Sequence, residues 1–435
     1  MVTGSAMQGS ALQRRSFIPP RPQRGVIVLA QRIAPWLYRL FLGAHLEVGQ
    51  QDVARLRALR GQGGLVVLNH PTIYDPIFAF GLSRYAGEPW FYLCALESFR
   101  EVHPLTAHFM TWVGAYSVRR GTLDRPSVEM TRRLLVEDRK VVLFAEGETY
   151  GLNDTLLPFQ EGAVQIGFWA LEDREKRGRK GPLWLIPVAI KYRLTGDVTS
   201  LLEARLRSLE VRLGLPVERG NFLRRLMRIG DTVLERLERE YQVTPPQGDL
   251  NARIAFLRHW VLERVAQTLK VRLRPEWTLQ EKIRALFNAV NEFLYGEEAL
   301  EVPPEWEEAL RLFHRDVARL HAFQAVQEGY VLSYPSPERF LDLLSRLEWE
   351  MTGQAPFYRP RSVLFSVGEP LDLGAFREAY RSNKRETVRR LTEEVRTRVK
   401  GLLRRLIART QPLPGMAPRA APSKGEEVFL TPEGA

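Results

Sequence analysis

Residues 66–78 read VVLNHPTIYDPIF, and this stretch joins a short apolar run to the polar sequence Asn69-His70-Pro71. The apolar run predicts a buried strand, and Pro71 suits the first position of a helix that follows it. Asp75 lies five positions after His70. Such positions are about 140° apart on a regular helix, so the two side chains can meet only if His70 precedes the first helical turn.

A carboxylate held against one imidazole nitrogen fixes the tautomer of the ring and leaves the other nitrogen as a base. His70 and Asp75 are therefore candidates for a catalytic pair. The alternative is that Asn69 and His70 cap a helix while Asp75 faces solvent. The chain has seven histidines, so a single His-x4-Asp pair arises easily by chance and needs support from its surroundings.

Strand and helix patterns alternate from residue 61 to about residue 196. The stretches GLVVLNH, KVVLFAEGE and WLIPVAIKYRL read as strands, and RPSVEMTRRLLVEDR reads as a helix between two of them. Much later, SVLFSVGEPLDL reads as another strand. This alternation predicts an α/β domain whose first part spans 51–196 and whose closing strand and helix span 356–410. The closing helix is expected at 382–409, with one apolar face made of Val388, Leu391, Val395, Val399, Leu402 and Leu406.

Residues 197–355 show helical periodicity only, so we expect a large all-helical insertion in the α/β domain. Pro245-Pro246, Pro303-Pro304 and Pro335 separate its segments. Residues 1–23 are rich in Ser, Gly, Pro and Arg, and residues 411–435 are rich in Pro and Gly. Both ends are predicted to be disordered because such segments cannot bury enough apolar surface.

Positive charge is concentrated in two segments of the chain. Residues 1–50 hold six Arg against Glu47, which gives +5, and residues 356–410 hold fourteen Lys/Arg against six Asp/Glu, which gives +8. The net charge of the whole chain is +12, and residues 51–355 sum to zero. This pattern predicts a surface that meets an acidic partner, either anionic lipid or nucleic acid. No zinc finger, RNA-binding sheet motif or zipper is present, so lipid is favoured over nucleic acid.

Residues 24–46 form a basic amphipathic stretch that follows the N-terminal arm. Val26, Leu29, Ile33, Trp36 or Leu37, and Leu40 recur at helical spacing, and Pro35 should kink or split the helix. Such a helix either lies in a membrane interface or packs on its own domain. No uncharged apolar run reaches ~18 residues, which predicts that the chain has no membrane span. The single cysteine, Cys94, excludes an internal disulfide, and no Cys/His cluster has the spacing of a zinc site.

Three further stretches carry residue types that suit an active site. GAYSVRRG brings Arg119 and Arg120 after an apolar run, as a phosphate clamp would require. LFAEGETYG places Glu146-Gly147 at the end of a strand, and Pro187 stands near the head of another. Taken alone, Arg119 could equally be a solvated charge, and Glu146 could be a turn residue.

In order and spacing, these stretches resemble the glycerolipid acyltransferase family, whose members acylate lysophosphatidic acid and related acceptors. The first block of that family, Asn-His-x-Ser-x-x-Asp, is matched by Asn69, His70, Thr72 and Asp75; the second by Gly114, Tyr116, Arg120 and Gly121; the third by Phe144, Glu146 and Gly147; and the fourth by Pro187. VGEPLDL, residues 367–373, resembles the closing segment of the family. The resemblance covers roughly residues 61–195 and 360–405.

The resemblance implies a mixed sheet flanked by helices, into which the helical segment is inserted. It implies that His70 deprotonates the acceptor hydroxyl as it attacks an acyl thioester, while Asp75 orients the imidazole. It assigns substrate binding to Arg120 with Arg119, to Glu146 and Gly147, and to Asn69 and Thr72. No metal or other cofactor is expected, because the donor would be acyl-CoA or acyl carrier protein.

Two departures from the family pattern concern the residues that bind the acceptor. Ala145 replaces the proline of the third block, and EGETY stands in place of Glu-Gly-Thr-Arg, so the arginine that helps to grip the acceptor phosphate is missing. Arg120, with Arg119 or Lys191, is left to bind that anion.

The resulting expectation is a peripheral enzyme on the cytoplasmic face of an anionic membrane, acting on a lysophospholipid such as 1-acylglycerol-3-phosphate. The alternatives are glycerol phosphate or a lyso-aminolipid as acceptor, or a non-catalytic protein that binds lipid or nucleic acid.

Overall fold

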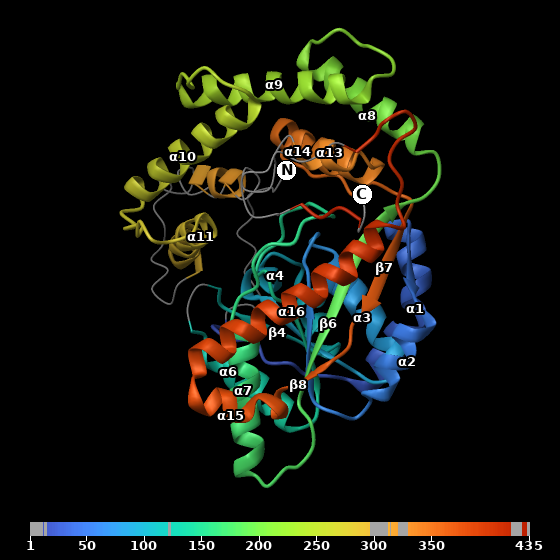
Figure 1. The fold of residues 1–435 in the computed structure, drawn as a ribbon, viewed down its shortest axis with the longest axis vertical. Coiled ribbons are helices and arrows are strands. Elements are labelled where there is room, and N and C mark those ends of the chain that lie inside the picture. Colours follow the sequence, from blue (N-terminus) through green and yellow to red (C-terminus); the bar gives the residue numbers. More distant parts are fainter. Residues whose placement is uncertain are drawn as a thin grey trace.

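The computed structural model describes residues 12, 15–120, 123–295, 312–313, 315–320, 329–418 and 429–432. Their centre is one eight-stranded sheet in the order β1-β7-β6-β2-β5-β3-β4, and β8 also pairs with β6 (Figure 1). The strands are β1 (Ala44–Val48), β2 (Gly64–Leu68), β3 (Phe91–Ala95), β4 (Ala115–Val118), β5 (Lys140–Phe144), β6 (Trp184–Leu194), β7 (Arg361–Val367) and β8 (Leu371–Asp372).

The sheet is mixed, as the sequence predicted. Strands β2, β3, β4, β5 and β6 run parallel to their neighbours in this group, whereas β7 runs antiparallel to β6 and parallel to β1. The helices of the α/β part are α1 (Arg24–Leu37), α2 (Gln50–Ala58), α3 (Asp75–Ala86), α4 (Leu96–Arg100), α5 (Pro104–Trp112), α6 (Arg125–Val136), α7 (Gly162–Lys176), α15 (Arg377–Ser382) and α16 (Lys384–Ile407). The predicted α/β fold, with helices flanking a mixed sheet, is therefore confirmed.

Helices cover the sheet on two faces, and strand alternation decides which side chains meet them. Leu65 and Val67 of β2 belong to one core, together with α6, α7 and α16. Val66 and Leu68 point the other way, into a core shared with α1, α2, α3 and α5. The six residues predicted for the apolar face of α16 are all buried against the first of these cores.

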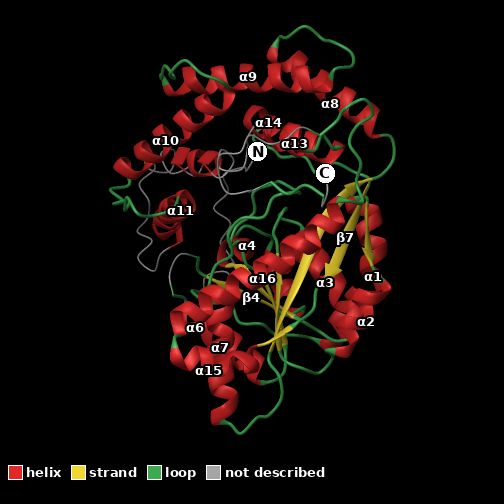
Figure 2. Ribbon diagram, in the orientation of Figure 1, coloured by secondary structure: helices red, strands yellow, loops and turns green. Residues whose placement is uncertain are grey.

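The described residues between β6 and β7 form helices and loops but no strand, and Figure 2 shows these helices gathered at one end of the sheet. Their bounds are α8 (Val198–Leu213), α9 (Phe222–Tyr241), α10 (Leu250–Thr268), α11 (Leu279–Tyr295), α13 (Gly329–Ser333) and α14 (Pro337–Thr352). Leu206, Ile229 and Leu257 lie in a separate core that these helices share. The all-helical insertion of the predicted fold is confirmed, although residues 296–311, 314 and 321–328 of it lie outside the described residues.

The N-terminal helix packs one side on its own domain and leaves its other side exposed, so its place in a membrane interface stays a prediction. It continues through Pro35 to Leu37 and then widens into a π-helical turn, η1 (Tyr38–Leu42). Ile27, Ala30, Ala34 and Tyr38 are buried on the domain, whereas the opposite side is exposed at Leu29, Ile33, Trp36, Leu40 and Phe41. By length and composition Arg24–Leu42 could cross a membrane, as the core helices of many soluble proteins also could. The expectation of no membrane span therefore stays a prediction.

Parts of the two ends that were predicted to be disordered pack on the domain instead. Ile18 is fully buried, and its N–H donates to Ser117 Oγ at 2.8 Å. Leu413 and Leu430 are also buried. Apolar residues spaced within a Pro-rich sequence supply this packing, and the prediction of disorder is wrong for residues 15–23, 411–418 and 429–432. Residues 1–11, 13–14, 419–428 and 433–435 lie outside the described part of the chain.

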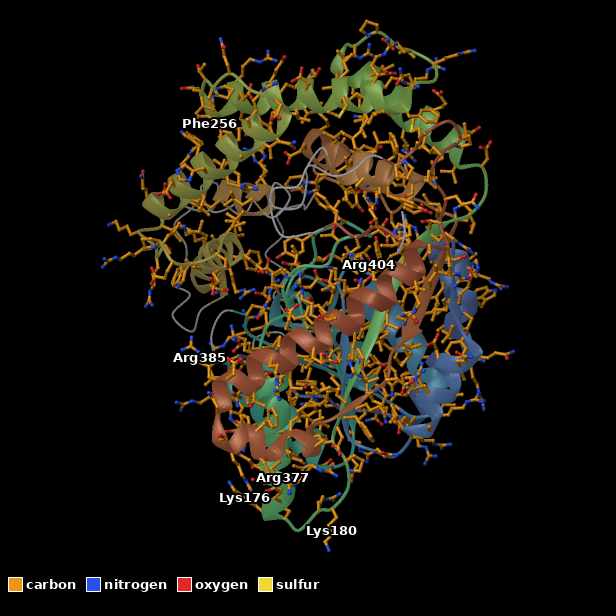
Figure 3. All side chains as sticks on the ribbon, in the orientation of Figure 1. Lys176, Lys180, Phe256, Arg377, Arg385 and Arg404 are labelled. Carbon is orange, nitrogen blue, oxygen red and sulfur yellow. The ribbon has the colours of Figure 1, made fainter. Side chains whose placement is uncertain are left out.

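The two basic segments meet where β1 pairs with β7, but their helices lie apart, and the expected surface for an acidic partner stays a prediction. Helices α1 and α16 pack on opposite faces of the sheet, and Figure 3 shows Arg385 and Arg404 far apart along α16. Several cations of the second segment are also paired with carboxylates, for example Arg377 with Glu175 at 2.5 Å. Linear charge sums could not reveal this, because they do not say which face of a sheet a helix covers.

Candidate active site

The predicted site residues follow the carboxyl ends of parallel strands, which lie at one edge of the sheet. His70 follows β2, Arg120 follows β4 and Glu146 follows β5. In open α/β sheets this edge is where ligands bind. The parallel arrangement of these strands thus brings together residues that are up to 76 positions apart in the sequence.

His70 and Asp75 are in direct contact. His70 Nδ1 lies 2.6 Å from Asp75 Oδ2, and the Asp75 side chain is completely buried. A turn closed by Asp75 N–H donating to Thr72 O at 3.2 Å folds the chain back between them. Helix α3 begins only at Asp75, with Pro76 in its first turn, so Pro71 does not start the helix as expected. The alternative of a solvent-facing Asp75 is excluded.

Three further donors complete the surroundings of Asp75. The Thr72 N–H donates to Oδ2 at 2.9 Å, and the Thr72 hydroxyl donates to Oδ1 at 2.9 Å. The Tyr192 hydroxyl also donates to Oδ1. A carboxylate at a helix N-terminus with donors on both oxygens is well stabilised as an anion. It accepts Nδ1–H of His70, which leaves the lone pair of the ring on Nε2.

Tyr192 is a member of the site that the sequence analysis missed. Its side chain points to the same face of the sheet as Ile186, Val188 and Ile190, because alternate residues of β6 share a face. His70 is on that face too, and its ring stacks on Phe144 with centroids 4.2 Å apart. Alternation along WLIPVAIKYRL was a usable signal, but the contact also required the register of β6 beside β2.

Glu146 connects its own turn after β5 to the segment around His70 that follows β2. Its carboxylate accepts the N–H of His70 at 2.8 Å on one oxygen and the N–H of Leu157 at 2.9 Å on the other. Burial raises the pKa of Glu146 to about 7, although both backbone donors oppose this shift. Gly147 follows at φ +81°, where a Cβ atom would lie 1.7 Å from Gln160 Nε2, so only glycine fits. Glu146 lies in a turn, as the simpler interpretation held, and it also fixes the main chain of His70.

Two predicted substrate contacts are engaged elsewhere. Asn69 is fully buried, and its side-chain amide bonds to both the N–H and the carbonyl of Ile190, each at 2.9 Å. It therefore joins β2 to β6 and does not contact substrate, which corrects its predicted role. Lys191 is also fully buried and is paired with Asp154, so it cannot hold the acceptor phosphate.

The two arginines of the second block are placed differently. Arg120 lines a cavity beside the strand ends, with its guanidinium 4.4 Å from the centre of the Phe287 ring and its Nε 4.0 Å from a Glu97 oxygen. Arg119 is not among the residues that line this cavity, and its backbone N–H donates to Asp124. Gly121, the last residue of the block, lies outside the described residues.

The cavity measures about 490 Å³ and is bounded by the α/β part and by the insertion. This volume is within the range of small-molecule sites. The α/β part contributes Thr72, Ile73, Tyr74 and Tyr192, and the insertion and its exit segment contribute Phe287, Leu341, Ser345, Trp349, Pro356 and Phe357. Among the described residues no group of three or more His, Cys, Asp or Glu could hold a metal ion.

Fold and site together define an α/β protein in which a buried carboxylate orients a histidine beside a cavity. Residues 46–191 match the family model described as Acyltransferase, and the chain thus carries a domain of the glycerolipid acyltransferase family. The match runs from β1 into β6 and includes His70, Asp75, Arg120 and Glu146, while the insertion lies beyond it. The family expected from the sequence blocks is confirmed. A comparison with curated proteins gives no match.

Proposed function

We propose that the chain is an O-acyltransferase that moves a fatty acyl group from acyl-CoA or acyl carrier protein to the hydroxyl of a lysophospholipid such as 1-acylglycerol-3-phosphate. The observation that carries the proposal is the 2.6 Å contact between His70 and Asp75 beside a cavity, inside a domain of the acyltransferase family.

In this proposal His70 Nε2 takes the proton of the acceptor hydroxyl as its oxygen attacks the thioester carbonyl carbon. The new C–O bond forms, the C–S bond breaks, and the imidazolium returns its proton to the departing thiolate. Asp75 stabilises the positive ring through the Nδ1 contact, and Glu146 holds the backbone of His70 in place. A positioned base of this kind contributes about 10²–10⁴-fold to the rate.

Arg120 is assigned to the phosphate of the acceptor, because it is the cation of the second block that lines the cavity. A second candidate acceptor, a lyso-aminolipid, is favoured by the charge of that cavity. Its lining includes three arginines and five carboxylates, namely Arg120, Arg346 and Arg361 with Glu97, Glu101, Glu148, Glu338 and Asp342. Glu97, Glu101 and Glu148 balance the three arginines, whereas burial raises the pKa of Asp342 and of Glu338, so these two carboxyls add only part of a negative charge to attract a cationic group.

The test is an acyl-transfer assay with acyl-CoA and acyl carrier protein as donors and a panel of phosphorylated and amine-bearing lysolipids as acceptors. His70→Ala should retain the melting temperature and lose about 10²-fold or more in kcat. The matched control His259→Ala, an exposed histidine of α10, should behave as wild type. Arg120→Ala should raise the KM for a phosphorylated acceptor more than that for the thioester. Wild-type transfer that survives in His70→Ala would refute the assignment of the base.

We further propose that the protein binds a membrane surface through an apolar face next to the site. This face consists of exposed residues of α1, η1, α5 and the start of α3: Leu29, Ile33, Trp36, Leu40, Phe41, Ile73, Ile77, Leu105, Phe109 and Trp112. The Gln23 N–H donates to the Trp112 carbonyl, and the Tyr38 hydroxyl donates to the Ile77 carbonyl; these bonds join the elements. Exposed apolar patches of this kind typically mark interaction sites. Attraction of nearby cationic side chains to the anionic lipids of a membrane surface would strengthen the binding of this peripheral protein.

A further inference from the structure

The insertion supplies one wall of the catalytic cavity. Thr72 and Tyr192 line the cavity and also contact Asp75, so two residues that hold the His70–Asp75 pair form part of the cavity wall. Opposite them lie Leu341, Ser345 and Trp349, which are spaced by four residues along α14 and share one side of that helix. A helix from outside the matched family domain therefore lines the same cavity, of about 490 Å³, as Thr72 and Tyr192.

This wall is held firmly against the α/β part. Arg339 of α14 is fully buried, with its Nε 2.9 Å from Asp154 and its Nη1 donating to Tyr330 O at 2.7 Å. Asp342 accepts the N–H of Asn153 at 2.9 Å. Buried charged groups with complete hydrogen bonding fix the relative positions of the elements that carry them. The cavity-facing side chains of α14 thus have a defined distance from the catalytic pair.

Most polar groups of this wall are used within the protein, which leaves an apolar surface for a ligand. Asp342 accepts the N–H of Asn153. Glu338 Oε1 accepts the N–H of Leu194 at 2.9 Å. The Arg361 guanidinium lies 3.8 Å from the centre of the Phe357 ring. Two buried atoms of α14, Glu338 Oε2 and Arg346 Nε, have no hydrogen-bond partner among the described residues. A buried polar atom left in this state is expected where a ligand supplies the partner.

One end of the cavity opens on the apolar face. Ile73 lines the cavity and is also 70% exposed, and Ile77 one turn further along is exposed beside η1. A lipid that rests on the apolar face could therefore enter at Ile73 without its chain crossing water. Arg120 and Ser98 supply polar groups to the lining of the same cavity.

We propose that this cavity binds the lysolipid acceptor, with its acyl chain along Leu341, Trp349 and Phe357, its headgroup towards Arg120 and its hydroxyl towards His70. Helix α14 of the insertion then sets the acceptor chain length that the enzyme accepts. This inference rests on the proposed acyltransferase function and adds the location of the acceptor site.

The experiment fills the cavity from the insertion side. Ser345→Trp should raise the KM for a long-chain lysolipid about tenfold or more, which corresponds to the loss of ~1.4 kcal/mol of binding. It should leave the KM for the thioester, and the rate with a short-chain water-soluble acceptor, within about twofold of wild type. Ser208→Trp is the matched control, because Ser208 is an exposed residue of α8 in the same insertion. Trp349→Ala, which enlarges the cavity, should shift the preference towards longer acceptor chains.

The outcomes separate this inference from the proposed function. If wild type transfers acyl groups to no acceptor, the proposed function fails. If wild type is active and Ser345→Trp changes the dependence on donor chain length instead, the cavity belongs to the donor and the inference is overturned. The inference is also overturned if Ser345→Trp affects all acceptors equally. Should Ser345→Trp not fold, the chain-length profile of Trp349→Ala decides alone, and an unchanged profile contradicts the proposal.

Discussion

The two sides of the catalytic cavity are built on different principles. On the α/β side, His70, Thr72 and Tyr192 all bond to Asp75, and both oxygens of its carboxylate have defined partners. On the insertion side, apolar side chains such as Leu341 and Trp349 form a wall, and the polar residues of α14 mainly attach it to the sheet. In the proposed enzyme, the family domain therefore supplies the reacting side chains, and the insertion supplies the wall that shapes the cavity. Substitutions on the first side should change kcat, and those on the second should change substrate preference.

The largest effect that this comparison predicts is on the α/β side, at Asp75. In Asp75→Asn an amide NH₂ would face one of the donors that now bond to the carboxylate, and the tautomer of His70 would no longer be fixed. We expect kcat to fall about 10²-fold or more, by the reasoning that applies to a triad carboxylate. Asp231→Asn is the control, since Asp231 is a half-exposed partner of Arg253 in the insertion. Equal activity of the two variants would contradict the role given to Asp75.

A second prediction compares two buried carboxyls, Glu146 on the α/β side and Asp342 on the insertion side. Burial raises the pKa of each to about 7. The folded chain therefore retains protons that the unfolded chain releases between the ordinary pKa values, 4.5 and 3.8, and about 7, so stability should fall as the pH rises through this window. At ~1.4 kcal/mol per pKa unit, Glu146→Gln should flatten this fall by up to roughly 3.5 kcal/mol and Asp342→Asn by up to roughly 4.5 kcal/mol.

Only one of these two variants should affect the chemical step. Glu146→Gln places an NH₂ group against the N–H of His70 or Leu157 and should lower kcat, whereas Asp342→Asn should leave kcat near wild type. Chemical unfolding between pH 4 and 8, combined with turnover at pH 7.5, checks both statements. A loss of kcat in Asp342→Asn as large as that in Glu146→Gln would break the division between the two sides.

The smallest predicted effect concerns the membrane and compares exposed apolar residues on the two parts. Trp36→Glu with Phe41→Glu should weaken binding to anionic vesicles at least about tenfold, because each buried apolar side chain is worth ~1.5–3 kcal/mol. Val211→Glu with Val217→Glu, on exposed positions of the insertion, is the matched control. Point substitutions test this face more specifically than removal of residues 1–46. That deletion would cut into β1 and expose the core that the buried side of α1 covers. Vesicle sedimentation at low and high salt measures the effect, and equal loss in both double variants would refute the proposed face.

The sequence by itself determined the parts of this protein that depend on local pattern. The alternation of strands and helices predicted the α/β domain, and the uninterrupted helical periodicity predicted the insertion. The pair His70 and Asp75 was visible because only five positions separate them, and the ordered blocks around Arg120 and Glu146 identified the family. Such features are encoded by neighbours in the chain, where periodicity and turn chemistry limit the possible structures.

Only the tertiary structure decided which distant residues meet. Tyr192 reaches Asp75 across 117 positions because β6 lies beside β2 in a particular register. That pairing also turned Asn69 into a link between strands, and Lys191 is removed from the site by its buried contact with Asp154. The placement of α14 over the cavity, and of α1 and α16 on opposite faces of the sheet, likewise followed from packing between elements far apart in the sequence. Periodicity shows that an element has an apolar side, but the surface that this side covers is selected by the fold as a whole.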